Sequence, residues 1–279
     1  MRIFLTGAKG MLDWFLDNPS GILVEILIVF LAIRWFSVPS DRRRAELVFF
    51  AAVAAHPAAV LIQNLLAFLA RAVPLKYDFF IDRFDARFGR PSFLVGEFFA
   101  EHHLALWGRF VYNLPFIITV GLVALYLWTG RSPAVVVRAN VLLWVLLVPL
   151  YIVLPVSGPR YAFSGFPYAH TTGILHAAVI PGAPNGVPSG HMAFALITLY
   201  LVRHWRWLVG PGLLFVLATG ATALGSGEHY LFDLILAVPF AALLSWISET
   251  PLMAYERVPF QESVPVWAIP FRDTGPART

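Results

Sequence analysis

The sequence predicts an all-α fold, a polytopic bundle of about seven membrane-spanning helices with interfacial helices in one long outward loop. Composition is the first reason: 59% of the 279 residues are hydrophobic and 13% are charged, whereas soluble domains carry about 25% charged residues. The second reason is that apolar residues form long runs, because a span needs about 20 of them. Cysteine is absent, which excludes disulfides and thiolate-bound metals.

Seven apolar runs fit a membrane span, although Glu25 and Arg34 interrupt the first and the fifth is short. The runs cover residues 21–38, 46–70, 108–129, 139–157, 189–203, 207–225 and 230–249. We expect residues 1–20 to form an interfacial segment, 21–250 one membrane-embedded domain, and 251–279 a cytoplasmic tail.

Basic residues orient the predicted bundle. Arginines cluster in the loops after the first, third and fifth runs, which share one side if the spans alternate; that side is cytoplasmic by the positive-inside rule. The remaining loops, 71–107, 158–188 and 226–229, then face outward from a plasma (inner) membrane. The net charge of +4 resides largely in short loops between spans, so no nucleic-acid partner is expected.

The outward loop 71–107 is expected to contain two amphipathic helices. Aromatic residues and aspartates recur at helical spacing over 77–88, which favours an interfacial helix. A break at Gly89-Arg90-Pro91 separates it from a second piece, 92–106. Four charged residues within or directly before the first helix are predicted to lie on its water-facing side: Lys76, Asp78, Asp82 and Asp85.

A Pro-Ser-Gly-His sequence, residues 188–191, stands directly before the fifth apolar run. Ser189 is the expected N-cap of that helix. Free backbone N–H groups and the helix dipole make such an N-terminus an anion site, suited to phosphate, and Gly190 lets an anion approach the backbone. His191 would stand at the mouth of the site, placed to protonate a leaving oxygen.

His229 precedes Asp233 by four residues at the start of the last run. Residues four apart share a helix face, so Asp233 can hold one imidazole nitrogen and leave the other free as a nucleophile. Histidine can itself form a covalent phosphoryl intermediate. Both histidines fall on the outward side that the arginines alone assign.

Arg160 follows the fourth run within Gly158-Pro159-Arg160-Tyr161, on the same outward side. Its planar guanidinium is suited to bidentate contact with phosphate. Tyr161, Glu228 and Thr222 are candidate residues of the pocket rim. The alternative for Arg160 is a snorkelling anchor at the end of a span.

Pro-Ser-Gly-His followed by His-x-x-x-Asp resembles the type-2 phosphatidate phosphatase and haloperoxidase superfamily, over a motif region of about residues 158–244. The resemblance implies that His191 is the general acid, that His229 is the nucleophile, and that Asp233 orients His229. It also implies a metal-free reaction through a phosphohistidine, with no cofactor.

Two positions depart from the motifs of that superfamily. Its third motif usually begins with Ser-Arg, where this chain has Thr222 and Ala223. Its first motif usually reads Lys, six residues, Arg-Pro. Arg90-Pro91 fits this spacing, with arginine for the lysine, but stands about a hundred residues before His191. We therefore favour Arg160 as the phosphate-binding arginine and a coincidental match at Arg90, and the sequence leaves open which of the two supplies the first-motif arginine.

These observations predict an integral-membrane lipid phosphatase that acts on a lipid phosphate or pyrophosphate at the outward surface. The degenerate third motif resembles the inositol phosphorylceramide synthase-like branch, so transfer of a phospho-headgroup between lipids is the first alternative. A non-catalytic lipid-binding or lipid-moving protein on the same scaffold is the second. The motifs leave open the lipid, the acceptor and the oligomeric state.

Overall fold

The computed structural model describes residues 61–62, 64–168, 180 and 182–250. The predictions for the interfacial segment 1–20, the first span 21–38, most of the second span and the tail 251–279 fall outside these residues. Within them every regular element is a helix, which confirms the predicted all-α fold; the number of spans is not settled by this part of the chain.

The helices follow the apolar runs closely, because their ends coincide with the arginines, glycines and prolines that bound each run. Their bounds are α4 Asp78–Asp85, η2 Ala86–Phe88, α5 Pro91–Glu101, α6 Ala105–Trp128, α7 Ala134–Val153, α8 Pro159–Ala162, α9 Gly190–Val202, α10 Arg206–Gly225 and α11 Leu231–Glu249. Four of them, α6, α7, α10 and α11, are long and apolar enough to cross a membrane.

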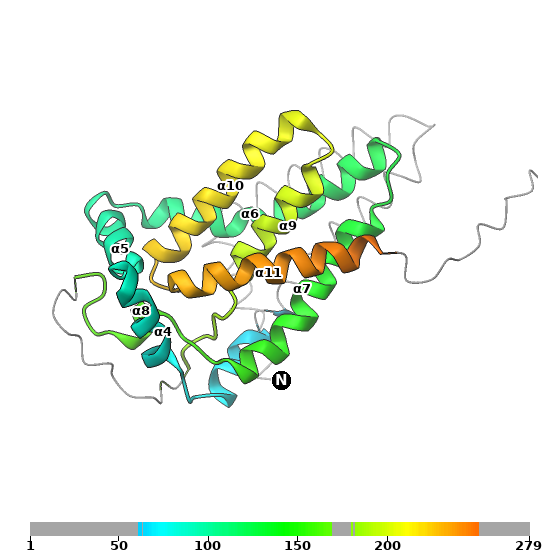
Figure 1. Ribbon diagram of the computed structural model, residues 1–279. Coiled ribbons are helices and arrows are strands. Elements are labelled where there is room, and N and C mark those ends of the chain that lie inside the picture. The colour runs from blue at the N-terminus through cyan, green and yellow to red at the C-terminus, as the bar shows by residue number, and fades with distance from the viewer. Residues whose placement is uncertain (1–60, 63, 169–179, 181, 251–279) are drawn as a thin grey trace, which may run out of the picture.

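Helix α9 is the centre of the bundle and packs against α6, α7, α10 and α11 (Figure 1). Its residues Ala193, Ala195 and Leu201 are almost completely buried. A helix that is apolar on all sides is typically buried. Because other helices surround α9, its 13 residues need not reach the length of a lipid-facing span. Because α9 begins with the Pro-Ser-Gly-His motif, its central place puts that motif inside the bundle.

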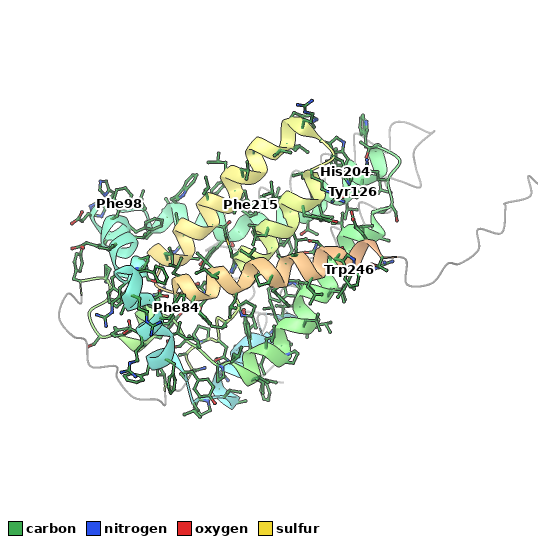
Figure 2. The ribbon with its side chains drawn as sticks, viewed as in Figure 1. Phe84, Phe98, Tyr126, His204, Phe215 and Trp246 are labelled. Carbon is green, nitrogen blue, oxygen red and sulfur yellow. The ribbon has the colours of Figure 1, made fainter. Side chains whose placement is uncertain are left out.

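The two predicted basic loops that the structure describes, around residues 130–138 and 203–206, lie at one end of the bundle, together with the end of α11. Arg203 forms an ion pair with Glu249 at 2.6 Å, Arg131 lies over the Trp205 ring, and Arg138 donates to the Ser248 carbonyl at the end of α11. Tyr126, His204 and Trp246 lie at this end, and Phe84 at the other (Figure 2). The loops after the third and fifth runs therefore share one end of the bundle, as inferred from the arginines, and the first arginine loop lies outside the described residues.

The opposite end is covered by the short helices α4, α5 and α8, where α10 ends and α11 begins (Figure 1). Helices were predicted here, but the orientation of the first was wrong. Phe79 and Phe80 are 48% and 65% exposed, whereas the four charged residues predicted to face water are buried: Lys76, Asp78, Asp82 and Asp85. In a membrane protein the apolar face of such a helix can turn outward, so its polar face turns toward the protein.

Candidate active site

Three segments far apart in the sequence meet beside α4, α5 and α8, joined by backbone hydrogen bonds. Ser189 N–H donates to the carbonyl of Asp233 at 3.2 Å, which joins the start of α9 to the start of α11. Arg160 N–H donates to the Gly227 carbonyl at 2.9 Å. The predicted acid, nucleophile and phosphate-binding segments thus lie together at one end of the bundle.

His229 and Asp233 form the predicted pair. The Nδ1 atom of His229 lies 3.3 Å from Asp233 Oδ2, which also accepts from Tyr230 N–H at 2.9 Å. Because a carboxylate only accepts hydrogen bonds, this contact assigns the ring proton to Nδ1 and leaves the Nε2 lone pair available. No described residue donates to the other oxygen, Oδ1, so Asp233 directs one oxygen to both partners.

Gly186 packs directly against the His229 ring. A Cβ atom at this position would lie 3.0 Å from His229 Nδ1 and 3.1 Å from Cε1. Gly186 N–H also donates to the Val156 carbonyl at 2.7 Å, which holds the segment before the Pro-Ser-Gly-His motif against the end of α7. The motifs did not indicate this glycine, because its role comes from a contact 43 positions away in the sequence.

His191 stacks on Tyr112 of α6, with ring centroids 4.1 Å apart and an interplanar angle of 14°. It is also near enough to His229 for the two rings to interact electrostatically. Sequence reasoning missed Tyr112, since one tyrosine within an apolar run carries no local signal. The stack fixes the plane of the imidazole that was predicted to donate the proton.

Replacing Tyr112 with leucine is expected to lower kcat about 2- to 10-fold, because a stacked ring contributes about 0.5–1.5 kcal/mol to holding its partner. Replacing it with phenylalanine keeps the ring and should change kcat little. The measurement is steady-state turnover of each variant, alone and combined with His191→Ala. An equal effect of Tyr112→Leu with and without His191 would contradict a role through His191.

The start of α9 is built as predicted. Ser189 is the N-cap, completely buried, and its hydroxyl accepts from Met192 N–H at 3.4 Å. Gly190 is the first helical residue, and a Cβ there would approach Leu147 Cδ1 to 3.0 Å. The glycine is therefore required for close packing of α9 on α7, and its role toward an anion stays a prediction.

Arg160 lies in α8 beside the His229 segment. Its guanidinium is 3.7 Å from Glu228 and its side chain is 51% exposed, a type of ion pair that contributes about 0–1 kcal/mol. It also lies over the ring of Tyr161, 5.5 Å from the centroid. The predicted nucleophile is therefore adjoined by Arg160, Tyr161 and Glu228. Because the ion pair between Arg160 and Glu228 is weak, the arginine can leave Glu228 to bind a phosphate.

The two residues that depart from the third motif, Thr222 and Ala223, are packed inside the bundle and not at its surface. Thr222 and Ala223 are completely buried, and Thr222 Cγ2 lies against Gly108 of α6. Thr222 is therefore not an exposed rim residue as predicted, because α10 presents it to α6. Ala223 occupies the position at which the third motif usually has arginine, and only its methyl group is packed there.

The Arg90 segment lies beside His229, although its distance in the sequence suggested otherwise. Ser92, at the start of α5, donates to the carbonyl of His229 at 3.1 Å, so this segment adjoins the predicted nucleophile although the two residues are 137 positions apart. The Arg90 side chain, however, is directed to Asp82, with Nε and Nη2 at 3.0 and 2.9 Å from the two carboxylate oxygens. Its guanidinium is engaged there in a bidentate ion pair.

A family model described as the PAP2 superfamily matches residues 82–247, more than half of the chain. The chain belongs to the PAP2 superfamily. The match includes both histidine motifs and the Arg90 segment. Searches of curated proteins and of solved structures found no match. Membership in this family, together with four helices suited to a membrane, supports phosphatase-type chemistry on a phosphoric ester by a membrane protein.

Proposed function

We propose that this PAP2 superfamily protein is a membrane lipid phosphatase that works through a phosphohistidine. The observation that carries the proposal is the contact between His229 Nδ1 and Asp233 Oδ2, because it prepares Nε2 as a nucleophile. The hydrogen bond from Ser189 to Asp233 supports a shared site, since it brings His229 to the helix end that bears His191.

In the proposed reaction, His229 Nε2 attacks phosphorus in line and the bond from phosphorus to the lipid oxygen breaks. His191 gives its proton to that oxygen, so the lipid leaves as an alcohol. Water then attacks the phosphohistidine, and His191 takes a proton from the water. Inorganic phosphate leaves and both histidines return to their starting states.

Arg160 and the backbone N–H groups at the start of α9 are proposed to bind the phosphoryl oxygens. The chemistry requires little from the protein beyond positioning and charge stabilisation. The start of α9 supplies the positive end of a helix dipole and backbone N–H groups, of which those of Met192 and Gly190 are bonded to uncharged hydroxyls. Neither role needs a metal or a cofactor. The proposed site lies at the extracytoplasmic surface, as the distribution of arginines predicts.

Transfer of a phospho-headgroup is the second candidate, and the buried Ala223 favours it. Alanine at this position provides no positive charge to neutralise the two negative charges of a phosphomonoester, the substrate of a phosphatase. A phosphodiester, the substrate of a headgroup transferase, carries only one negative charge. The two reactions share every step up to the phosphohistidine. They differ in whether water or a lipid hydroxyl accepts the group.

The test is turnover by purified protein in detergent on phosphatidate, polyprenyl phosphates, polyprenyl pyrophosphates and phosphatidylinositol. Each substrate is assayed with and without a lipid alcohol as acceptor, and both free phosphate and new phospholipid are measured. Phosphate release without an acceptor supports the phosphatase. New phospholipid formed only with an acceptor supports the transferase. No turnover on any substrate, with His191→Ala and His229→Ala indistinguishable from the wild type in lipid binding, would favour the non-catalytic alternative.

A further inference from the structure

Helix α4 carries buried carboxylates that the reaction above does not use. Asp78, Asp82 and Asp85 stand on one face of the helix, and their side chains face the protein. Asp82 pairs with Arg90, but no cation lies within ion-pair distance of Asp78 or Asp85 among the residues described. Buried charges need hydrogen-bond donors to offset the loss of water, and the question is which donors these two use.

Asp85 binds the start of α11. Its Oδ2 accepts from Leu231 N–H at 2.7 Å and its Oδ1 from Phe232 N–H at 3.2 Å. These are the first two residues of the helix, directly after the His229 segment. The first N–H groups of a helix have no partner within it, so a carboxylate 146 positions earlier acts as the cap.

Asp78 binds the segment before Arg160. It accepts from Ser157 N–H at 2.9 Å, Ser157 Oγ–H at 3.0 Å and Gly158 N–H at 2.9 Å. It also accepts from the Tyr230 hydroxyl at 3.0 Å, and Tyr230 directly follows His229. One carboxylate therefore joins the arginine segment to the nucleophile segment.

The energetics fit a structural use of the two charges. Burial raises the pKa of both carboxyls, while their backbone N–H donors lower it. The donors thus offset part of the cost of removing the carboxylates from water. A carboxylate at a helix N-terminus contributes about 0.3–1 kcal/mol, and up to about 2 kcal/mol when partly buried.

The same contacts decide which helix end is free for an anion. The α11 N-terminus already holds the Asp85 carboxylate, and a phosphate could not share it because like charges repel. At the α9 N-terminus the groups that accept are the hydroxyls of Ser189 and Tyr151 and a backbone carbonyl, which carry no net charge.

We propose that α4 is a positioning element of the active site, in which Asp85 fixes the His229 segment and Asp78 fixes that segment to the Arg160 segment. The proposal rests on the proposed function for its kinetic consequence. In this arrangement, α4 also reserves the α9 N-terminus for the phosphoryl group.

The test uses full-length protein in detergent with Asp85→Asn, Asp78→Asn and Glu249→Gln. The last is the matched control, a carboxylate-to-amide change at the far end of the bundle. An asparagine can accept from one N–H but opposes the second, so each aspartate variant should displace its segment. Misplacement by about 1 Å can cost about 100-fold in rate. We expect kcat to fall 10- to 100-fold for both aspartate variants, with KM little changed, and no effect in the control.

Amide hydrogen exchange gives a readout that does not need turnover. Asp85→Asn should speed exchange only in the peptide that contains residues 229–234. Asp78→Asn should speed exchange in that peptide and also in the peptide that contains residues 156–161. If the wild type is active and both aspartate variants keep its kcat, the positioning proposal is overturned. If the wild type shows no turnover on any substrate, the proposed function fails and exchange alone decides: unchanged exchange at 229–234 in Asp85→Asn overturns the role of α4.

Discussion

Replacing His229 with alanine is expected to reduce turnover of any lipid phosphate by about 10⁴-fold or more, because it removes the nucleophile. Replacing His191 with alanine should cost about 10²- to 10⁴-fold, the usual contribution of a general acid. The distinguishing substrate is an aryl phosphate with a good leaving group, which needs no proton from the enzyme. His191→Ala should form the phosphohistidine from that substrate at nearly the wild-type rate, although hydrolysis of this intermediate still lacks the His191 base, and His229→Ala should form none.

The measurement is initial rate on both kinds of substrate, with acid-labile phosphoprotein measured after rapid quenching. Wild type and His191→Ala should form phosphoprotein from the aryl phosphate, and His229→Ala should form none. Phosphoprotein of normal amount in His229→Ala would assign the nucleophile to another residue. Equally slow formation of phosphoprotein from both substrates in His191→Ala would remove its role as the acid.

Replacing Gly158 with alanine is expected to lower kcat about 100-fold. Its φ of 99° is a conformation that favours glycine, and a Cβ there would lie 2.3 Å from the Glu228 carbonyl oxygen. The backbone must move by about 1 Å, which separates the Arg160 segment from the His229 segment. The left-handed conformation alone costs about 1–3 kcal/mol for a residue other than glycine.

Gly130→Ala separates the two effects. Gly130 also has a positive φ, 71°, but no atom lies within 4 Å of the position of its Cβ. Both variants should therefore unfold at lower temperature, whereas only Gly158→Ala should lose turnover. The measurements are thermal unfolding in detergent and kcat. Similar kcat values in the two variants would mean that the contact between residues 158 and 228 does not set the geometry of the site.

Much of this architecture could be predicted from local patterns. The described helices agree with the predicted runs to within a few residues, because charged residues and helix breakers end each run. His229 and Asp233 were predicted to meet because four residues make one turn. Ser189 was predicted as a cap because few residue types can fill that position.

The parts that could not be predicted depend on contacts between distant segments. Amphipathic spacing shows that α4 has two different faces, but it does not say which one meets the protein. Phe79 is exposed and Asp78 is buried, which is the reverse of what is expected for a helix on a soluble protein. Likewise Tyr112 and Gly186 have no motif, and their proximity to His191 and His229 comes from the packing of α6 and of the segment before α9.

Helix α11 is held at both ends by residues of other helices. Asp85 binds its first N–H groups, and Arg138 binds the carbonyls of Ser248 and Thr250 at its end. Its 19 residues span about 28 Å, close to the thickness of a bilayer's hydrocarbon core, about 30 Å. Because these contacts oppose sliding of α11 along its own axis, we expect a change in bilayer thickness to be met by tilting of the bundle or by deformation of the bilayer around it. The depth of His229 is then set by a fixed length of helix. For the proposed lipid phosphatase, we expect a substrate to be selected partly by how far its phosphorus stands above the acyl chains.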